Sequence, residues 1–233
     1  MKIGIIGAGM IGATLARRLT ALGHEVVIAN SRGPETLREL AAETGARAVT
    51  AAAAAHGGEI VIVTIPQRAV PGLPGDLFAG IPEDVVVVDT GNYYPARDGR
   101  IDAIEDGQAE SAWVAEHVGR PVVKAFNNIV AQSLLENGRP EGAPGRIALP
   151  VAGDPPWARQ KVMRLVDELG FDPVEAGGVE DSWRQQPGTP CYAADLDAPR
   201  LKEALAAADR ARLPEYRGKA DDGTYTGFCV SEF

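Results

Sequence analysis

Short runs of β-branched residues alternate along the chain with longer segments in which apolar residues recur at helical spacing. Several short runs are continuously apolar, such as Ile60-Val61-Ile62-Val63 and Val85-Val86-Val87-Val88. A strand has this composition when helices cover both faces of its sheet, which is typical of parallel sheets. The pattern predicts strands at Lys2–Ile6, Glu25–Ala29, Arg47–Thr50, Glu59–Ile65, Asp84–Asp89, Pro121–Phe126, Arg146–Ala152 and Asp172–Glu175.

Apolar residues three or four positions apart predict helices between these strands. The first helix is indicated by a stripe made of Ile11, Leu15, Leu19 and Leu22. Gly23 follows, where a left-handed residue ends many helices, and Pro34 can open the next helix because its missing N–H is not needed there. Further helical segments are predicted at Ala51–Ala55, Ile129–Glu136, Pro155–Leu169 and Ala198–Ala211.

The alternation of strands and helices predicts right-handed βαβ units. We therefore expect an α/β fold of the Rossmann type, with a doubly wound, mostly parallel sheet and a small C-terminal helical segment. The strand pattern stops near Gly177-Gly178. This change predicts a Rossmann-like domain over residues 1–178 and a small C-terminal cap and tail over residues 179–233.

The charge of the chain limits the partners that it can be expected to have. Among 233 residues, 23 are Lys or Arg and 32 are Asp or Glu, which gives a net charge of −9. An acidic balance argues against nucleic acids and anionic membranes, because both are bound by clustered Lys and Arg. We therefore expect a small-molecule ligand.

Cysteine usage and hydropathy indicate a cytoplasmic protein. Cys191 and Cys229 are far apart, and neither belongs to a Cys-x-x-Cys motif, so no disulfide framework and no metal site are expected. Gly, Pro or a charged residue interrupts every apolar run before it reaches the length of a membrane span. The N-terminal apolar run could be taken for a signal peptide, but glycines and Arg17-Arg18 follow it too soon.

The first motif that carries chemistry is a glycine-rich turn, Gly7-Ala8-Gly9-Met10-Ile11-Gly12. The chain has 27 glycines, so the spacing alone is weak, but here it directly follows an apolar strand and opens an amphipathic helix. In such a turn the first glycine permits the tight bend, the second lets a pyrophosphate approach the backbone, and the third allows close packing of the helix. Free N–H groups at the helix start then face the phosphates. The motif predicts a bound dinucleotide rather than a turn without a ligand.

The end of the second strand indicates which dinucleotide binds. NAD-binding units place Asp or Glu there to hold the ribose 2′-OH, but this strand is followed by Asn30, Ser31 and Arg32, and Glu25 is at its other end. A guanidinium and a hydroxyl can bind a 2′-phosphate, which a carboxylate would repel. We expect NADP(H). The alternative is a solvated turn in which Ser31 caps the next helix, and Arg38 is a weaker candidate for the phosphate.

Polar residues at later strand ends form a third group. Pro66 follows Ile65 at the end of one run, Thr90 and Asn92 follow the next, and Asn127 follows the one after. Ligands bind at the carboxyl ends of strands in such sheets, so these positions predict a nicotinamide pocket. Each residue taken alone is equally well explained as a strand terminator or a helix cap.

No residue is assigned here as catalytic. The histidines, His24, His56 and His117, are scattered, and no Tyr-xxx-Lys pair follows the strands. Chemistry that needs only hydride transfer and positioning fits this composition, because the cofactor then supplies the reactive group. The loop Trp183–Pro190 is either a lid that contacts a second substrate or a structural turn packed on Trp183.

Taken together, these motifs resemble the NADP-dependent F420 oxidoreductase family, to which the cytosolic NADPH domain of six-transmembrane metalloreductases is related. The likeness spans about residues 1–178 and is carried by the glycine turn, Asn30-Ser31-Arg32, Pro66, Asp89-Thr90-Gly91-Asn92, Lys124-Ala125-Phe126-Asn127 and Gly170-Phe171-Asp172-Pro173. It implies hydride transfer between NADPH and a deazaflavin or flavin. It also implies a homodimer whose C-terminal part helps to close the site.

The resemblance also assigns roles to individual residues. It implies that the first five residues of the glycine turn contact the pyrophosphate, and that Asn30, Ser31 and Arg32 hold the 2′-phosphate. By the same likeness, Ile65 and Pro66 line the dinucleotide path, and Thr90, Asn92 and Asn127 lie near the reacting rings.

We therefore expect an NADPH-dependent oxidoreductase with F420 or a flavin as its hydride acceptor. The first alternative is a reductase of a small imine or carbonyl compound, which would need Tyr93, Asp89 or Tyr192 as a proton donor. The second alternative is a non-catalytic module that senses NADP(H) and signals through a partner.

Overall fold

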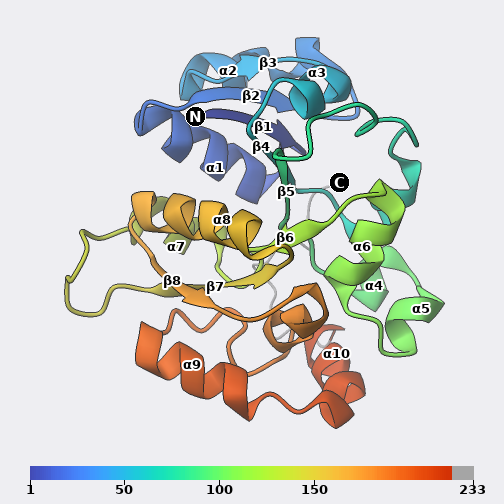
Figure 1. Ribbon diagram of the computed structural model, residues 1–233, viewed down its shortest axis with the longest axis vertical. Coiled ribbons are helices and arrows are strands. Elements are labelled where there is room, and N and C mark those ends of the chain that lie inside the picture. Colours follow the sequence, from blue (N-terminus) through green and yellow to red (C-terminus); the bar gives the residue numbers. More distant parts are fainter. Residues whose placement is uncertain (222–233) are drawn as a thin grey trace.

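The continuous apolar runs form the strands of one sheet, which the computed structural model describes within residues 1–221. The sheet has eight strands in the order β3-β2-β1-β4-β5-β6-β7-β8 (Figure 1). Their bounds are β1 (Lys2–Ile6), β2 (Glu25–Ala29), β3 (Arg47–Ala48), β4 (Ile60–Val63), β5 (Val86–Asp89), β6 (Val122–Lys124), β7 (Ala148–Gly153) and β8 (Asp172–Glu175).

Strands β1 to β6 are parallel to one another. Strand β7 runs antiparallel to β6, and β8 is parallel to β7. The strand order reverses between β1 and β4, which is the position where Rossmann-type sheets bind their ligand. The predicted doubly wound, mostly parallel α/β fold is confirmed. The strands β1, β2, β4, β5 and β6 all end at one side of the sheet, which we call the carboxyl edge.

Helices follow most of the strands. Their bounds are α1 (Met10–Ala21), α2 (Arg38–Thr44), α3 (Ala51–His56), α4 (Pro95–Asp98), α5 (Asp102–Glu105), α6 (Glu110–Val118), α7 (Ala131–Glu136), α8 (Pro156–Glu168), α9 (Ala198–Ala207) and α10 (Leu213–Asp221). Short 3₁₀ helices are η1 (Pro34–Leu37), η2 (Gln67–Gly72), η3 (Val179–Gln185) and η4 (Arg210–Arg212). Gly23 ends α1 with a φ of 84°, and Pro34 opens η1, as the sequence predicts.

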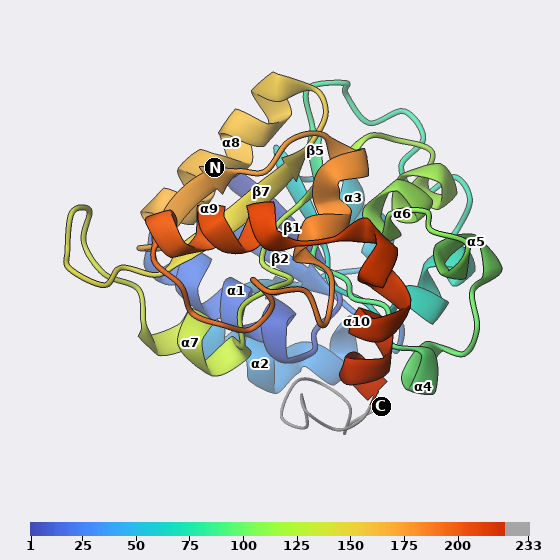
Figure 2. The same cartoon turned by 90° about the horizontal axis from the view of Figure 1, so that it is seen from below.

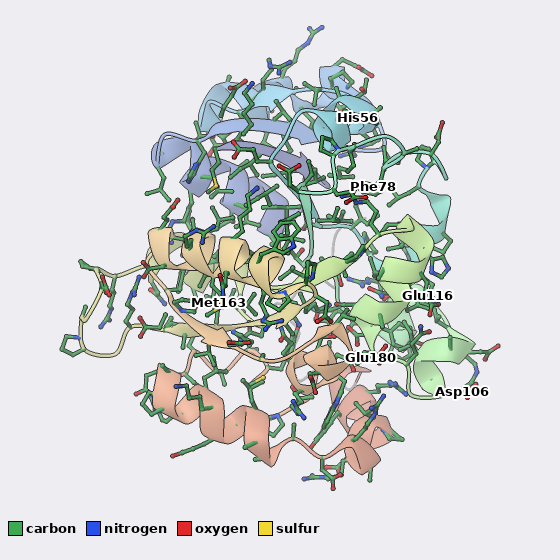
Figure 3. All side chains as sticks on the ribbon, viewed as in Figure 1. His56, Phe78, Asp106, Glu116, Met163 and Glu180 are labelled. Carbon is green, nitrogen blue, oxygen red and sulfur yellow. The ribbon has the colours of Figure 1, made fainter. Side chains whose placement is uncertain are left out.

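Alternate residues of the central strands feed two separate cores. On β4, Ile60 and Ile62 pack with α1, α7 and α8, while Val61 and Val63 pack with α3 and α6 on the other face. Figure 3 shows these two sides, with Met163 on α8 and Phe78 in the loop that follows η2. Burial on both faces explains why these strands are continuously apolar.

Several elements differ from the sequence prediction. The third strand is only Arg47–Ala48, because Thr50 instead caps α3 by accepting a hydrogen bond from the N–H of Ala53. Helices α4, α5 and α6 occupy the segment between β5 and β6, where no helix was predicted. Two of them have four residues, which is too short to leave a periodic pattern.

Beyond Gly178 the chain contains η3, α9, η4 and α10 rather than one helix with a loop. Helix α9 packs on β7 and β8 from the face opposite α8, and Figure 2 shows it crossing that side of the sheet, with α10 next to α4. A small apolar cluster that includes Leu201 and Leu205 joins α9 to these strands. The division into residues 1–178 and 179–233 stays a prediction, and the tail from residue 222 onward lies outside the described residues.

Candidate functional site

The glycine turn connects β1 to α1 at the carboxyl edge, and two of its glycines are required by close packing. Gly7 has a φ of 115°, and a Cβ there would stand 2.1 Å from the carbonyl oxygen of Thr64. A Cβ on Gly12 would stand 2.1 Å from the carbonyl oxygen of Gly7. The Gly7 N–H donates to the Ala29 carbonyl at 2.8 Å, which ties the turn to the end of β2.

Gly9 differs from these two glycines because open space lies above it. A Cβ on Gly9 would meet no atom within 4 Å, although Gly9 is the N-cap residue of α1. No side chain caps this helix, and its first turn has no acidic residue, so its N–H groups and positive dipole end face outward. Ala8 and Ile11 are half-buried here, and Met10 is 50% exposed. This arrangement fits the pyrophosphate of a dinucleotide.

The loop after β2 carries the residues predicted to hold the 2′-phosphate. Asn30 Oδ1 accepts a hydrogen bond from the Arg32 N–H at 3.0 Å, which closes a tight turn around Ser31. Ser31 and Arg32 are exposed, and Glu25 lies at the opposite end of β2. Within residues 1–221, no ion pair or hydrogen bond engages the Arg32 guanidinium, so it is available to a ligand.

The end of β4 lies directly beside the glycine turn. A Cβ added to Gly7 would stand 3.0 Å from Ile65 Cγ2. Pro66 is the N-cap residue of η2. The N–H and hydroxyl of Thr90 both point to the Val63 carbonyl oxygen, at 3.1 and 3.4 Å, and so connect the ends of β4 and β5. The structure therefore places Ile65, Pro66 and Thr90 along one line of strand ends.

Asn92 and Asn127 are in direct contact, although 35 residues separate them. Asn92 Nδ2 donates to the Asn127 carbonyl at 2.9 Å, and Asn127 Nδ2 donates to Asn92 Oδ1 at 3.0 Å. Gln185 of η3 contacts Asn127 twice. Its side-chain Nε2 donates to Asn127 Oδ1 at 2.9 Å, and its backbone carbonyl accepts from Asn127 Nδ2 at 2.7 Å. The Tyr192 hydroxyl accepts from Asn92 Nδ2 at 3.2 Å and shares a short hydrogen bond with the Tyr94 hydroxyl.

Backbone strain is concentrated around this group of amides and hydroxyls. Among the described residues other than glycine, positive φ angles occur at Phe126 (62°), Ala193 (57°) and Asp195 (46°). Phe126 precedes Asn127, Ala193 follows Tyr192, and the Ala193 N–H donates to the Asn128 carbonyl at 2.9 Å. Residues in this conformation cost free energy and are found preferentially at binding and catalytic sites.

Buried polar atoms without partners lie in the same region. Within the described part of the chain, Asn128 Oδ1, Gln185 Oε1 and Gln186 Nε2 are buried and have no hydrogen-bond partner. Such atoms are uncommon in folded proteins because each one forfeits its hydration. Other buried atoms without a partner, such as Thr20 Oγ1 and Arg217 Nε, lie on α1 and α10, so it is the strained backbone that distinguishes this part of the carboxyl edge.

A buried ammonium holds the ends of β5 and β6 together behind these residues. Lys124 Nζ is 3.1 Å from Asp89 Oδ2 and 3.9 Å from Glu110 Oε2, and it also donates to the Gly91 carbonyl. The Ser111 hydroxyl donates to Asp89 Oδ2 at 2.7 Å, and the Tyr93 N–H donates to Glu110 Oε2 at 3.1 Å. Burial raises the pKa of Glu110 to about 7, and the ammonium opposes part of that rise.

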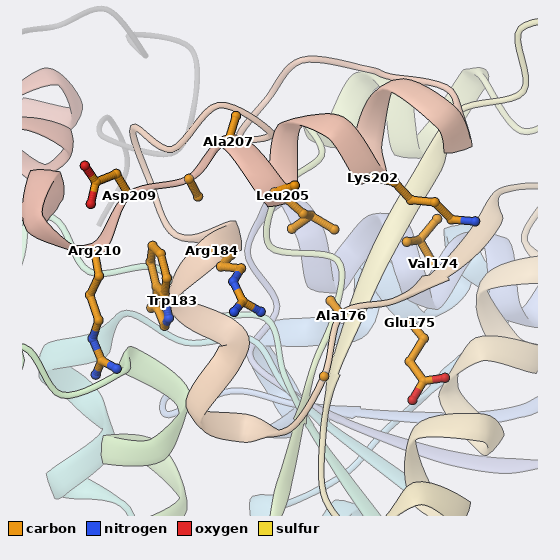
Figure 4. A pocket seen from close by; sticks show the side chains of 13 residues that line it. Val174, Glu175, Ala176, Trp183, Arg184, Lys202, Leu205, Ala207, Asp209 and Arg210 are labelled. Atoms are coloured by element: carbon orange, nitrogen blue, oxygen red, sulfur yellow. The ribbon is translucent and has the colours of Figure 1, made fainter.

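The loop Trp183–Pro190 belongs largely to the protein interior. Trp183 is 7% exposed and Gln185 is fully buried, so the predicted structural turn describes this segment better than a lid does. Trp183 also forms a wall of a cavity of about 780 Å³ between β8, η3 and α9, with the guanidiniums of Arg184 and Arg210 at 5.5 and 6.0 Å from its ring (Figure 4). None of the predicted dinucleotide residues lines this cavity.

Residues 1–221 carry neither a metal-binding cluster nor an ionised thiol. Residues 1–221 hold no group of three or more His, Cys, Asp or Glu side chains arranged for a metal ion. Burial raises the pKa of Cys191 to about 12, so its thiol stays protonated at neutral pH. No helix within these residues combines the length and the apolar character that a membrane span requires.

The sequence does not predict the buried cluster, and it places Gln185 only in the Trp183–Pro190 loop, as part of either a lid or a structural turn. Lys124 did carry a signal, because it is a charged residue at the end of a continuously apolar strand, as Asp89 is on the neighbouring strand. Two opposite charges at the same end of adjacent parallel strands could have been paired. Glu110 and Gln185 lie in segments without a strand pattern, and no local signal indicates their contacts.

Comparisons with known proteins find similar sequences over part of the chain. A family model described as NADP oxidoreductase, coenzyme F420-dependent, matches residues 2–93. The Escherichia coli (strain K12) protein YjhV is 50% identical over 86 residues, which are 35% of this chain and 63% of that protein.

Solved structures are similar over more of the chain. A hypothetical protein from Sinorhizobium meliloti, SMa0349, is 34% identical with a TM-score of 0.70, over 84% of this chain and 95% of that one. A structure described as "a putative f420 dependent nadp-reductase from arthrobacter sp. fb24" is 24% identical with a TM-score of 0.64, over 78% of this chain and 87% of that one. The second likeness is one of fold.

Replacing two of the glycines separates ligand binding from folding. Gly9→Ala adds a methyl group in open space, at φ −74° and ψ −170°, so the free energy of unfolding should change by less than about 0.5 kcal/mol. The same methyl group should weaken NADPH binding at least about tenfold, because it occupies the approach to the turn. Gly12→Ala should instead lower stability by about 2 kcal/mol through overpacking. Urea denaturation and nucleotide fluorescence titration measure both quantities, and unchanged NADPH binding by Gly9→Ala would contradict the placement.

The buried carboxyl of Glu110 makes stability depend on pH. In the unfolded chain Glu110 ionises near its ordinary pKa of 4.5, whereas in the folded protein its pKa is about 7. Between these values the folded state holds a proton that the unfolded state has lost, so stability should fall as pH rises from 5 to 7 and then level off. The loss attributable to this group is about 3 kcal/mol.

The measurement compares urea denaturation of the wild type and Glu110→Gln from pH 5 to pH 8. Glutamine keeps an oxygen for the Tyr93 N–H but cannot ionise. The difference between the two proteins should change with pH, and a constant difference would refute the assignment. Glu116→Gln, on the exposed side of the same helix, is the matched control and should show no such change.

Proposed function

Because a family model described as NADP oxidoreductase, coenzyme F420-dependent, matches residues 2–93, we propose that the chain transfers hydride between NADP(H) and a deazaflavin or flavin acceptor. The observation that carries this proposal is the combination of an open glycine turn with an acid-free end of β2. Gly9 leaves space for the pyrophosphate, and Arg32 offers an unengaged guanidinium where an NAD-specific unit has a carboxylate. The hydrogen bond from the Gly7 N–H to the Ala29 carbonyl ties the glycine turn to the end of β2 at the carboxyl edge.

Different residues of the chain would bind different parts of the dinucleotide. The N–H groups at the start of α1 would bind the pyrophosphate, and the Arg32 guanidinium with the Ser31 hydroxyl would bind the 2′-phosphate. The line of strand ends from Ile65 to Thr90 would carry the nucleotide toward Asn92 and Asn127. When bound, NADPH supplies the hydride, so the main contribution of these side chains is to orient the rings and exclude water.

A second candidate function, reduction of a small imine or carbonyl compound, is favoured by the position of Tyr192. Asp89 is held in the buried ion pair, and the Tyr93 hydroxyl lies within hydrogen-bond distance of the Gly99 carbonyl and the Glu105 carboxylate instead. The Tyr192 hydroxyl lies next to Asn92, beside the residues predicted to surround the reacting rings. A hydroxyl there could donate a proton from Oη to a substrate heteroatom.

The homodimer stays a prediction.

Arg32→Ala tests the nucleotide assignment. Losing a charge-assisted contact should weaken NADPH binding by roughly 1–3 kcal/mol, which is about five- to 150-fold in Kd. NADH has no 2′-phosphate, so its Kd should change less than about twofold. Arg38→Ala tests the weaker candidate for the phosphate, an exposed arginine at the start of α2, and should leave both values unchanged. Equal losses for NADPH and NADH in Arg32→Ala would count against the phosphate site.

The acceptor is identified by following NADPH oxidation with F420, FMN, FAD and 1-pyrroline. Turnover with F420 or a flavin is the expected result. Turnover with 1-pyrroline alone would favour the second candidate. Tight NADPH binding without turnover on any acceptor would instead favour the module that senses NADP(H), and it would refute hydride transfer to a flavin or deazaflavin.

Tyr192→Phe tests the proton donor of the second candidate. Removing the hydroxyl should lower kcat for 1-pyrroline about 100-fold while leaving the Kd of NADPH unchanged. Tyr93→Phe is a matched control, because the Tyr93 hydroxyl bonds to Gly99 and Glu105 rather than to Asn92. A wild-type rate in Tyr192→Phe would show that the proton comes from elsewhere.

A further inference from the structure

The loop between β2 and η1 is held by a chain of side-chain hydrogen bonds that the nucleotide assignment does not use. Asn30 Nδ2 donates to the Thr36 hydroxyl at 2.9 Å, and that hydroxyl donates to the Gly33 carbonyl at 2.8 Å. On its other side, Asn30 Oδ1 accepts from the Arg32 N–H at 3.0 Å. The amide of Asn30 therefore spans the loop from Arg32 to Thr36.

The Thr36 hydroxyl and the Arg32 N–H together fix the orientation of the Asn30 amide. Its hydroxyl gives its proton to Gly33, so its oxygen can only accept from Asn30, and an accepting oxygen selects the amide nitrogen. With nitrogen on the Thr36 side, the amide oxygen faces the Arg32 N–H, as the turn requires. Without the hydroxyl, the nitrogen loses this partner, and the Arg32 N–H alone selects the orientation of the amide.

The backbone of the same loop needs this support. Gly33 has a φ of 97°, and the Glu35 carboxylate folds back so closely that a Cβ on Gly33 would stand 2.4 Å from its Oε1 atom. The exposed Glu35 carboxylate thus lies against the backbone at Gly33, although no acidic residue stands at Asn30, Ser31 or Arg32 directly after β2. Where Ser31 and Arg32 are placed relative to that carboxylate then determines whether the loop attracts or repels the phosphate.

We propose that Thr36 is a positioning residue for NADP selectivity, because it fixes the Asn30 amide and thereby the turn that presents Ser31 and Arg32 to the 2′-phosphate. This inference rests on the proposed function. Thr36 itself does not contact the phosphate. Its contribution is preorganisation, since a turn that is already formed loses less conformational entropy when the phosphate binds.

The test compares Thr36→Val, which removes only the hydroxyl, with Thr36→Ser, which keeps it. The Kd values of NADPH, NADH and adenosine 2′,5′-bisphosphate are measured by fluorescence titration or calorimetry. Thr36→Val should weaken binding of NADPH and of the bisphosphate about three- to tenfold, the usual worth of one exposed hydrogen bond. NADH should change less than about twofold, and Thr36→Ser should bind all three ligands as the wild type does.

Asp197→Ala is the control for a general loss of stability. The Asp197 carboxylate accepts from the Arg200 N–H at 3.1 Å to cap α9, which packs on β7 and β8 at the other end of the sheet from β2. This variant should lose stability in urea without changing the ratio of the NADPH and NADH dissociation constants. A change in that ratio in Thr36→Val therefore reports on positioning and not on folding.

A double-mutant cycle with Arg32→Ala separates this inference from the proposed function. If Thr36 acts through Arg32, Arg32→Ala/Thr36→Val should lose little more NADPH affinity than Arg32→Ala alone. Additive losses, an equal effect on NADH, or no rescue by serine would overturn the role of Thr36 while the phosphate site stands. If Arg32→Ala leaves the ratio unchanged, or the wild type binds neither nucleotide, the proposed function fails and this inference fails with it.

Discussion

The ion pair between Lys124 and Asp89 fixes the part of the carboxyl edge where β5 and β6 end. One ammonium joins the ends of two neighbouring strands and also binds the Gly91 carbonyl, so the chain that leaves β5 is anchored at its first residues. Asn92 comes directly after this anchor, and Asn127 is three residues beyond Lys124. A buried ion pair contributes little net stability once desolvation is counted, but an unpaired buried charge would cost several kcal/mol. The pair therefore dictates where the two amides meet.

The part of the carboxyl edge formed by the glycine turn depends instead on backbone packing. This is why its backbone geometry can be predicted from the sequence. Gly7 and Gly12 leave no room for a side chain, and Gly9 leaves room for a ligand, as the spacing of the three glycines indicates. Such requirements are local, because they involve a strand, a turn and a helix that follow one another. The same holds for the central strands, whose continuous apolar runs reflect burial on both faces.

The remaining part of the site arises from contacts between distant segments, and its residues have no local signature. Gln185 reaches Asn127 across 58 residues of sequence, and Glu110 approaches Lys124 from a helix that the periodicity does not reveal. Thr36 resembles any other polar residue in a turn until its hydroxyl is seen between Asn30 and Gly33. Sequence patterns report burial and backbone conformation, whereas the pairing of polar side chains depends on the assembled fold.

The reversed direction of β7 determines which part of the chain completes the edge. Since β7 and β8 run against β6, the chain leaves β8 at the opposite side of the sheet, and η3 brings it back along β6 and β7 to Asn127. The residues proposed to bind the pyrophosphate and the 2′-phosphate thus lie before residue 33, while Gln185 and Tyr192 come more than a hundred residues later. A change in the later segment would alter the surroundings of Asn92 and Asn127 while leaving the proposed phosphate-binding segment intact.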